Sequence, residues 1–250
     1  MSRIIVISLV LLTLGAGVSS RALGQVRFDN WLYYQRNTDD STRWQYRPRF
    51  YVPFDLGSGW TFTQRADLPV YYTDRAGPEN TGGGWKAGIG DWFVEETLTT
   101  PEIAKNTRGS LGVRLVFPTG GLSPFGSGQY QWAPTASLSY TSQELNTTFA
   151  PIVRYFMSYH ASEAAAGKVR RLDLYPTVTK RFDSMWAISV WNENAISYNR
   201  QTEKWFVPLD AMLLYRARKD LEFTFGAAYG VVRDDPQYLS MVYGRVTLYF

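Results

Sequence analysis

From about residue 26 to the C-terminus, apolar and polar side chains alternate in short segments that turn residues separate. The last segment is the clearest. Its outer positions Val242, Val246 and Phe250 are apolar, whereas Arg245 falls on the other face. A period of two is typical of a β-strand with one apolar and one polar face. The alternation recurs about once every 18 residues, which is the weak but repeated signature of a transmembrane β-barrel.

The pattern therefore predicts an all-β fold, a transmembrane antiparallel up-and-down β-barrel of about 12 strands. Three of the segments alternate less regularly, at 26–36, 85–99 and 185–198. With both termini on the periplasmic side, short turns should alternate with longer outside loops. We expect turns at 55–59, 100–107, 142–146, 181–184 and 217–220, and outside loops at 37–42, 73–85, 118–128, 160–168, 198–203 and 233–237.

Aromatic residues on the predicted outer faces form a second pattern. Several strands carry one near each end, ten or twelve positions apart, as in Trp44 and Phe54 or Trp205 and Tyr215. Ten residues rise about 23 Å in a strand tilted by roughly 45°, which matches the apolar band between two aromatic girdles. The predicted girdle residues are Trp44, Trp60, Tyr72, Tyr130, Tyr140, Tyr159, Trp186, Trp205, Tyr215, Tyr238 and Phe250.

The N-terminus differs from the rest of the chain. Arg3 precedes an apolar stretch from residue 4 to 18, and Ala22-Leu23-Gly24 fits a small-residue cleavage site. We interpret residues 1–24 as a secretory signal peptide and residues 25–250 as an outer-membrane barrel; a permanent anchor is the alternative. Removal of the signal takes Arg3 and Arg21 away, so the net charge falls from +4 to about +2 and gives little evidence for an anionic partner.

Composition excludes several classes of protein. The 250 residues contain no cysteine and one histidine, which argues against disulfide frameworks, zinc ribbons and histidine-rich metal sites. Forty aromatic residues argue against disorder. Mean hydropathy of −0.25 excludes a bundle of membrane helices. We expect no metal, no cofactor and no nucleic-acid partner, and the sequence leaves the oligomeric state open.

The predicted inner faces carry charges of both signs, many of them near mid-strand. Charges at membrane depth are costly unless they are paired or solvated. A belt of this kind can form a constriction that selects solutes, or a closed network of arginine–carboxylate pairs that stiffens the wall. Inward-facing aromatic rings such as Tyr175 and Tyr243 either guide a ring-containing solute or fill space. The candidate pore-lining residues are Arg47, Arg49, Arg65, Asp67, Asp91, Glu95, Arg114, Arg154, Asp173, Asp210, Arg216 and Arg245.

A catalytic site has little support. Ser158 and His160, two positions apart, would share a strand face, but no orienting third group accompanies them. We interpret His160 as a residue at the edge of a loop and expect no catalytic residue. The triplet Gly82-Gly83-Gly84 lacks the Lys-Ser/Thr of a phosphate loop.

Several stretches resemble a known family. They include residues 88–91, the run Leu111–Gly120, residues 122–140 and the segment Gly226–Arg233. Together, over residues 85–250, they are similar to the outer-membrane β-barrel family labelled "pathway of phenol meta-degradation", whose members are described as transporters. The resemblance implies passage of small organic compounds, aromatic ones included, and it assigns no substrate-binding residue.

We therefore expect a narrow channel in the bacterial outer membrane, with lipid and a small-molecule solute as its partners. A structural or adhesive barrel with a closed lumen is the main alternative. A barrel hydrolase acting through His160 is a third hypothesis.

Overall fold

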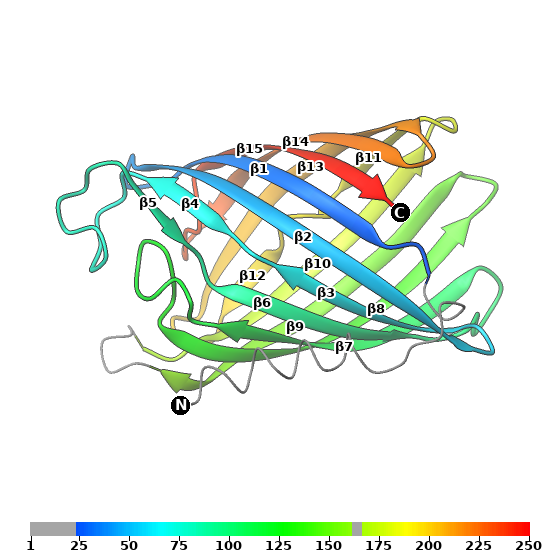
Figure 1. The fold of residues 1–250 in the computed structure, drawn as a ribbon, viewed down its shortest axis with the longest axis horizontal. Helices are drawn as coiled ribbons and strands as arrows, with labels where there is room; N and C mark the ends of the chain where they lie inside the picture. Colours follow the sequence, from blue (N-terminus) through cyan, green and yellow to red (C-terminus); the bar gives the residue numbers. More distant parts are fainter. Residues whose placement is uncertain (1–23, 162–166) are drawn as a thin grey trace.

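The computed structural model describes residues 24–161 and 167–250. These residues form fifteen antiparallel strand segments that close into one barrel (Figure 1). Among them, no helix is long and apolar enough to cross a membrane. The predicted signal peptide lies outside the described residues, apart from Gly24, so it stays a prediction.

The segments have these bounds: β1 Arg27–Arg36, β2 Thr42–Gly57, β3 Trp60–Asp67, β4 Val70–Thr73, β5 Lys86–Ile89, β6 Trp92–Thr99, β7 Thr107–Phe117, β8 Gln129–Ser142, β9 Thr147–Ala161, β10 Arg170–Arg181, β11 Trp186–Val190, β12 Ile196–Asn199, β13 Lys204–Arg218, β14 Leu221–Arg233 and β15 Ser240–Tyr249. Three pairs are halves of one interrupted strand, because both halves pair with the same neighbour: β3 and β4 with β2, β11 and β12 with β13, and β5 and β6 with the β3–β4 strand. The described chain thus makes a twelve-stranded barrel, which confirms the predicted fold.

Closure occurs through the first strand. β1 pairs along its whole length with β15 on one side and with β2 on the other, so the sheet has no free edge there. The backbone N–H of Phe250 donates to the carbonyl of Val26, which places the C-terminus beside the start of β1. The tight turns, such as that from Arg218 to Leu221, lie at this end. The 74–85 loop between β4 and β5 lies at the opposite end (Figure 1).

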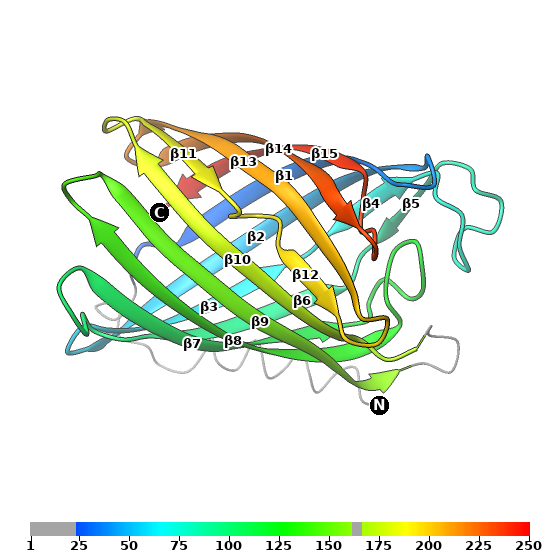
Figure 2. The same cartoon turned by 180° about the vertical axis from the view of Figure 1, so that it is seen from behind.

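The three interruptions have local causes. At the first, Pro69 has no N–H to donate, and its carbonyl accepts the N–H of Gly90 instead. Gly90 marks the second, where a Cβ would lie 2.3 Å from the ring of Tyr71, so only glycine fits. At the third, Trp191 adopts a left-handed φ of 47°, and the next residues leave the ladder (Figure 2). The last two fall in the irregular segments that the sequence indicated.

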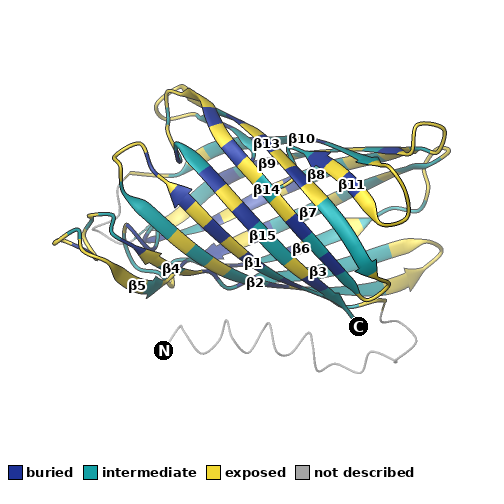
Figure 3. Cartoon of the chain, turned by 90° about the horizontal axis from the view of Figure 1, so that it is seen from above, coloured by how far each residue is buried: buried dark blue, intermediate teal, exposed yellow. Residues whose placement is uncertain are grey.

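Burial is inverted relative to a water-soluble protein. Among the described residues, 23 polar or charged residues are buried against 14 apolar ones, whereas large apolar side chains such as Leu111 and Val242 are exposed. Exposed and buried positions alternate along β13, β14 and β15 (Figure 3). The polar faces therefore point into the barrel and the apolar faces point outward, as a lipid environment requires.

Aromatic pairs span neighbouring strands near both ends of the barrel. At the turn end, Trp186 and Tyr215 lie 4.5 Å apart between ring centroids. At the loop end, Tyr72 and Trp85 lie 4.7 Å apart. Of the predicted girdle residues, the structure exposes Trp44, Trp60, Tyr72, Tyr140, Tyr159, Trp186, Trp205 and Phe250, and it half-buries Tyr130 and Tyr215.

Tyr238 corrects the girdle prediction. It is buried and packs edge-on against Phe206, with ring centroids 4.8 Å apart, inside the barrel. The prediction extended the alternation of the last strand back from Phe250, but β15 begins only at Ser240. Tyr238 lies in the preceding loop, where the period of two no longer determines the direction of a side chain.

Candidate functional site

Eleven of the twelve predicted charged residues lie on strands, on the faces that point into the barrel. The group comprises Arg47 and Arg49 on β2, Arg65 and Asp67 on β3, Glu95 on β6, Arg114 on β7, Arg154 on β9, Asp173 on β10, Asp210 and Arg216 on β13, and Arg245 on β15. Asp91 differs, because it lies in the interruption between β5 and β6. Its carboxylate accepts hydrogen bonds from the N–H groups of Gly120 and Ser127 and from the Ser127 hydroxyl. It thus anchors the 118–128 loop.

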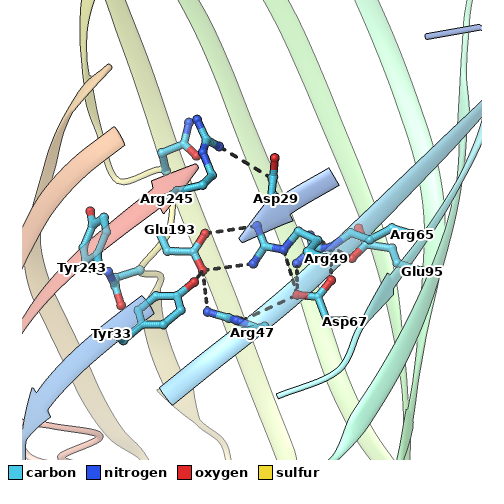
Figure 4. A network of polar contacts seen from close by, with 12 residues as sticks. Asp29, Tyr33, Arg47, Arg49, Arg65, Asp67, Glu95, Glu193, Tyr243 and Arg245 are labelled. Atoms are coloured by element: carbon cyan, nitrogen blue, oxygen red, sulfur yellow. Dashed lines mark hydrogen bonds and ion pairs between the residues drawn. The ribbon is translucent and has the colours of Figure 1, made fainter. Parts of the chain in front are cut away.

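Eight of the inner charges form one connected set, which we call the lumen network (Figure 4 draws part of it). It consists of Arg47, Arg49, Arg65, Arg114, Arg154, Asp67, Glu95 and Glu193. Five arginines face three carboxylates, so the network carries a formal charge of +2.

Asp67 and Glu95 are the two fixed acidic centres of the lumen network. Asp67 is fully buried, and its oxygens lie 2.8 Å from Nε of Arg49 and 2.7 Å from Nε of Arg65. Glu95 lies 2.5 Å from Nη2 of Arg114 and 2.8 Å from Nη2 of Arg154. Charge-assisted bonds of this kind hold guanidinium groups in fixed orientations.

Glu193 is the member that crosses the barrel. Its carboxylate lies 2.7 Å from Nη2 of Arg47 and 3.1 Å from Nη2 of Arg49, both on β2. The hydroxyl of Tyr33 on β1 donates to it at 2.7 Å. Four strands separate the β11–β12 strand from β2 on one side and six on the other. The contact therefore joins nearly opposite walls, and we call it the Glu193 bridge.

The segment that carries the bridge, residues 191–195, is held by Asp210 on β13. One oxygen of Asp210 accepts the backbone N–H groups of Asn192, Glu193 and Asn194, each at 3.2 Å. The other oxygen accepts the side-chain amide of Asn194 at 2.9 Å and the hydroxyl of Tyr243 at 2.5 Å. Successive N–H groups that converge on a carboxylate form an anion-binding nest. Asp210 thus positions the bridge rather than standing free in the lumen.

A second charged cluster lies near the turn end. Arg245 lies 2.5 Å from Glu222 and 3.8 Å from Asp29, and Arg216 lies 3.8 Å from Glu222. On β10, Asp173 pairs with Arg171 at 2.8 Å. These contacts join the same or neighbouring strands, so they stiffen the wall without crossing the lumen.

Aromatic rings lie beside the arginines of β2. Trp31, Tyr33 and Tyr243 form a cluster with centroids 5.5 to 5.9 Å apart. The guanidinium of Arg47 lies 4.5 Å from the Tyr33 ring centre, and that of Arg49 lies 5.2 Å from that of Trp31. The cluster supports the two guanidinium groups by cation–π contact.

Sequence reasoning missed Asp29 and Glu193. Asp29 lies in the segment 26–36, where the alternation of apolar and polar residues is irregular. Glu193 lies in the segment 185–198, which was expected to be one strand, but the chain leaves the ladder there and alternation no longer determines side-chain direction. The run Asn192-Glu193-Asn194 was an available signal, because two asparagines within three positions of a predicted strand indicate a turn.

Ser158 and His160 do not form a pair. The register between β8 and β9 shifts so that Gln131 opposes Ser158 whereas Tyr130 opposes His160, which leaves Tyr159 as an extra residue. Such a bulge breaks the alternation, so the expectation of a shared face was wrong. The Ser158 hydroxyl accepts the N–H of Val169, and the exposed His160 ring lies 5.8 Å from that of Tyr130.

Comparisons with known proteins bear on the fold. No family model and no curated protein matches the chain. Among solved structures, an outer-membrane channel from Pseudomonas putida F1 aligns with a TM-score of 0.70 at 10% identity, over 92% of this chain and 96% of that one. The NanC porin aligns with a TM-score of 0.55 at 15% identity, over 90% and 98%. The β domain of the Bordetella autotransporter BrkA gives 0.50 at 12% identity, over 91% and 99%. At these identities the likeness shows the barrel fold alone.

Proposed function

We propose that this chain is a channel of the bacterial outer membrane that passes small solutes through a narrow, charged lumen. One observation carries the proposal, namely the inverted burial. Its polar interior and apolar exterior suit a barrel with lipid outside and water inside. The P. putida channel, which shares the fold, supports the same role. In this proposal both termini lie on the periplasmic side.

The charged inner residues would line the passage and set its width. The diameter of a twelve-stranded barrel lies between that of small barrels, which side chains fill, and that of wide porins. Each large inward side chain therefore reduces the width of the passage appreciably. Arg47 and Arg65 keep 17% and 15% of their side-chain surface accessible inside the barrel. The resemblance of residues 85–250 to the phenol meta-degradation family extends the proposal to small aromatic compounds.

Planar-bilayer recordings of the purified full chain test the proposal. We expect discrete single-channel steps whose size changes in Arg49→Ala and in Arg114→Ala, because each variant removes a large cation from the inner wall. Liposome swelling with neutral sugars gives an independent measure of passage. A barrel that never conducts and never accelerates swelling, in the wild type and in both variants, would contradict the channel.

A closed barrel with a structural role is the second candidate, and the Glu193 bridge favours it. The bridge ties nearly opposite walls together, and a permanent bridge would obstruct solute passage. Glu193→Ala distinguishes the two functions. A channel that the bridge narrows should conduct more in this variant, whereas a structural barrel should stay closed and lose stability only. A hydrolase has no such support, because His160 and Ser158 face opposite sides of β9.

A further inference from the structure

The two sides of the Glu193 bridge differ in how their backbones are paired. The groups that receive it come from continuous strands, β1 and β2, which pair with each other along ten residues. The group that enters comes from the interruption 191–195, which lies outside the registered pairs with β10 and β13. The N–H of Trp191 still donates to the carbonyl of Asp210 on β13, and the residues after it leave the ladder. The receiving groups thus lie on paired strands, whereas the segment that carries Glu193 is held by the Asp210 side chain instead of by ladder pairs. Such a contact can open locally, because local opening is easiest where backbone pairing between strands is sparse.

The receiver has the chemistry of a carboxylate-binding site. Two guanidinium groups and one phenol converge on Oε1 of Glu193, and Nη1 of Arg49 also donates to Oε2 at 3.4 Å; we call these three residues the Arg47–Arg49–Tyr33 cradle (Figure 4). Arginine is suited to this task because its fixed fork of donors matches a carboxylate. Arg49 also lies 2.8 Å from the buried Asp67, so the cradle would keep its shape if Glu193 left.

The cradle also has unused capacity for an anion. The lumen network holds five arginines against three carboxylates, so departure of Glu193 would leave an excess of three positive charges. Among the described atoms, Nε of Arg47 is buried without a hydrogen-bond partner, although the same guanidinium contacts Glu193. Unpaired buried donors and uncompensated charge are costly, so an anionic solute that reached the cradle would be stabilised there.

We propose that the Arg47–Arg49–Tyr33 cradle is a binding site for the carboxylate group of a small organic acid, and that Glu193 occupies it when solute is absent. The proposal rests on the proposed channel and names its substrate class. Glu193 is a tethered competitor, and displacing it both binds the solute and separates the bridged walls. The apparent affinity for the solute is therefore reduced by the fraction of molecules in which the bridge is closed.

The test compares three small ligands that share one ring and differ in charge at neutral pH: benzoate, benzyl alcohol and benzylamine. Calorimetric titration of the full chain in detergent should detect benzoate alone. With the bridge closed in about 90% of molecules, Glu193→Gln and Glu193→Ala should each bind benzoate about 10-fold tighter, because about one molecule in ten is competent in the wild type. Glu222→Gln is the matched control. It removes a buried inner carboxylate that pairs only with arginines of neighbouring strands, and it should leave the affinity unchanged.

Arg49→Gln should abolish benzoate binding. Three results would each overturn the proposal: equal binding of benzoate and benzyl alcohol, no gain of affinity in either Glu193 variant, and inorganic phosphate binding as tightly as benzoate. Conductance is measured separately. If the barrel binds benzoate but never conducts, the carboxylate site stands and the channel proposal is wrong. If the barrel conducts but does not bind benzoate, the channel proposal stands and the carboxylate site is wrong.

Discussion

The position of the Glu193 bridge depends on a single buried carboxylate, that of Asp210, and Asp210→Asn tests this dependence. The carboxylate accepts three backbone N–H groups on one oxygen, and the Asn194 amide and Tyr243 hydroxyl on the other. A hydrogen bond to a charged group contributes about 1.5–3 kcal/mol. An asparagine keeps one acceptor oxygen, but it turns an amide donor toward Asn194. We expect a loss of about 3 kcal/mol in the free energy of unfolding.

Urea unfolding of the protein refolded into phospholipid vesicles, followed by tryptophan fluorescence, measures this loss. Asp220→Asn is the control. Asp220 is exposed in a turn and pairs only with the exposed Arg218, at 3.2 Å, so its removal should cost less than about 1 kcal/mol. Because Asp210 holds the segment that carries Glu193, Asp210→Asn should also raise the single-channel conductance. If it unfolds at the same urea concentration as the wild type, the nest does not hold the segment and the reasoning is refuted.

Three other substitutions test separate parts of the structure. Leu111→Arg, on the exposed outer face at mid-strand, should cost about 2–4 kcal/mol in vesicles; a negligible cost would contradict lipid contact. Gly226→Ala places a Cβ 2.2 Å from the buried Tyr243 ring, so we expect lower urea resistance, and unchanged resistance would refute the close packing. Asp91→Asn should speed limited proteolysis within the 118–128 loop, and an unchanged cleavage rate would show that other contacts hold that loop.

The repeated parts of this protein could be predicted from its sequence. Strands with a period of two, such as the one ending at Phe250, alternate because the backbone directs successive side chains to opposite faces. Apolar faces such as that of Leu111 and Val113 therefore predicted lipid contact, and the alternation assigned arginines such as Arg114, which the structure buries, to inner faces. The number of strands followed from counting the alternating segments, and the barrel followed from their regular repetition.

The prediction failed wherever the period is interrupted. Tyr238 precedes its strand, and the bulge at Tyr159 separates His160 from Ser158. In each case the side-chain direction depends on a register shift or a loop, which a neighbouring strand decides. The local sequence does not specify which residue of the neighbouring strand lies opposite, and this register sets the direction of the side chain.

The sequence by itself determined the strands, their faces, the aromatic bands and a charged inner wall. Only the tertiary structure decided which charges meet. The bridge joins Glu193 to Arg47 and Arg49, more than 140 positions away, and the partners of Asp67 and Glu95 depend on the stagger of the strands around the barrel. Ion pairing requires contact within about 4 Å, and the segment 191–195, which leaves the strand ladder inside the closed barrel, brings Glu193 within that distance of β2.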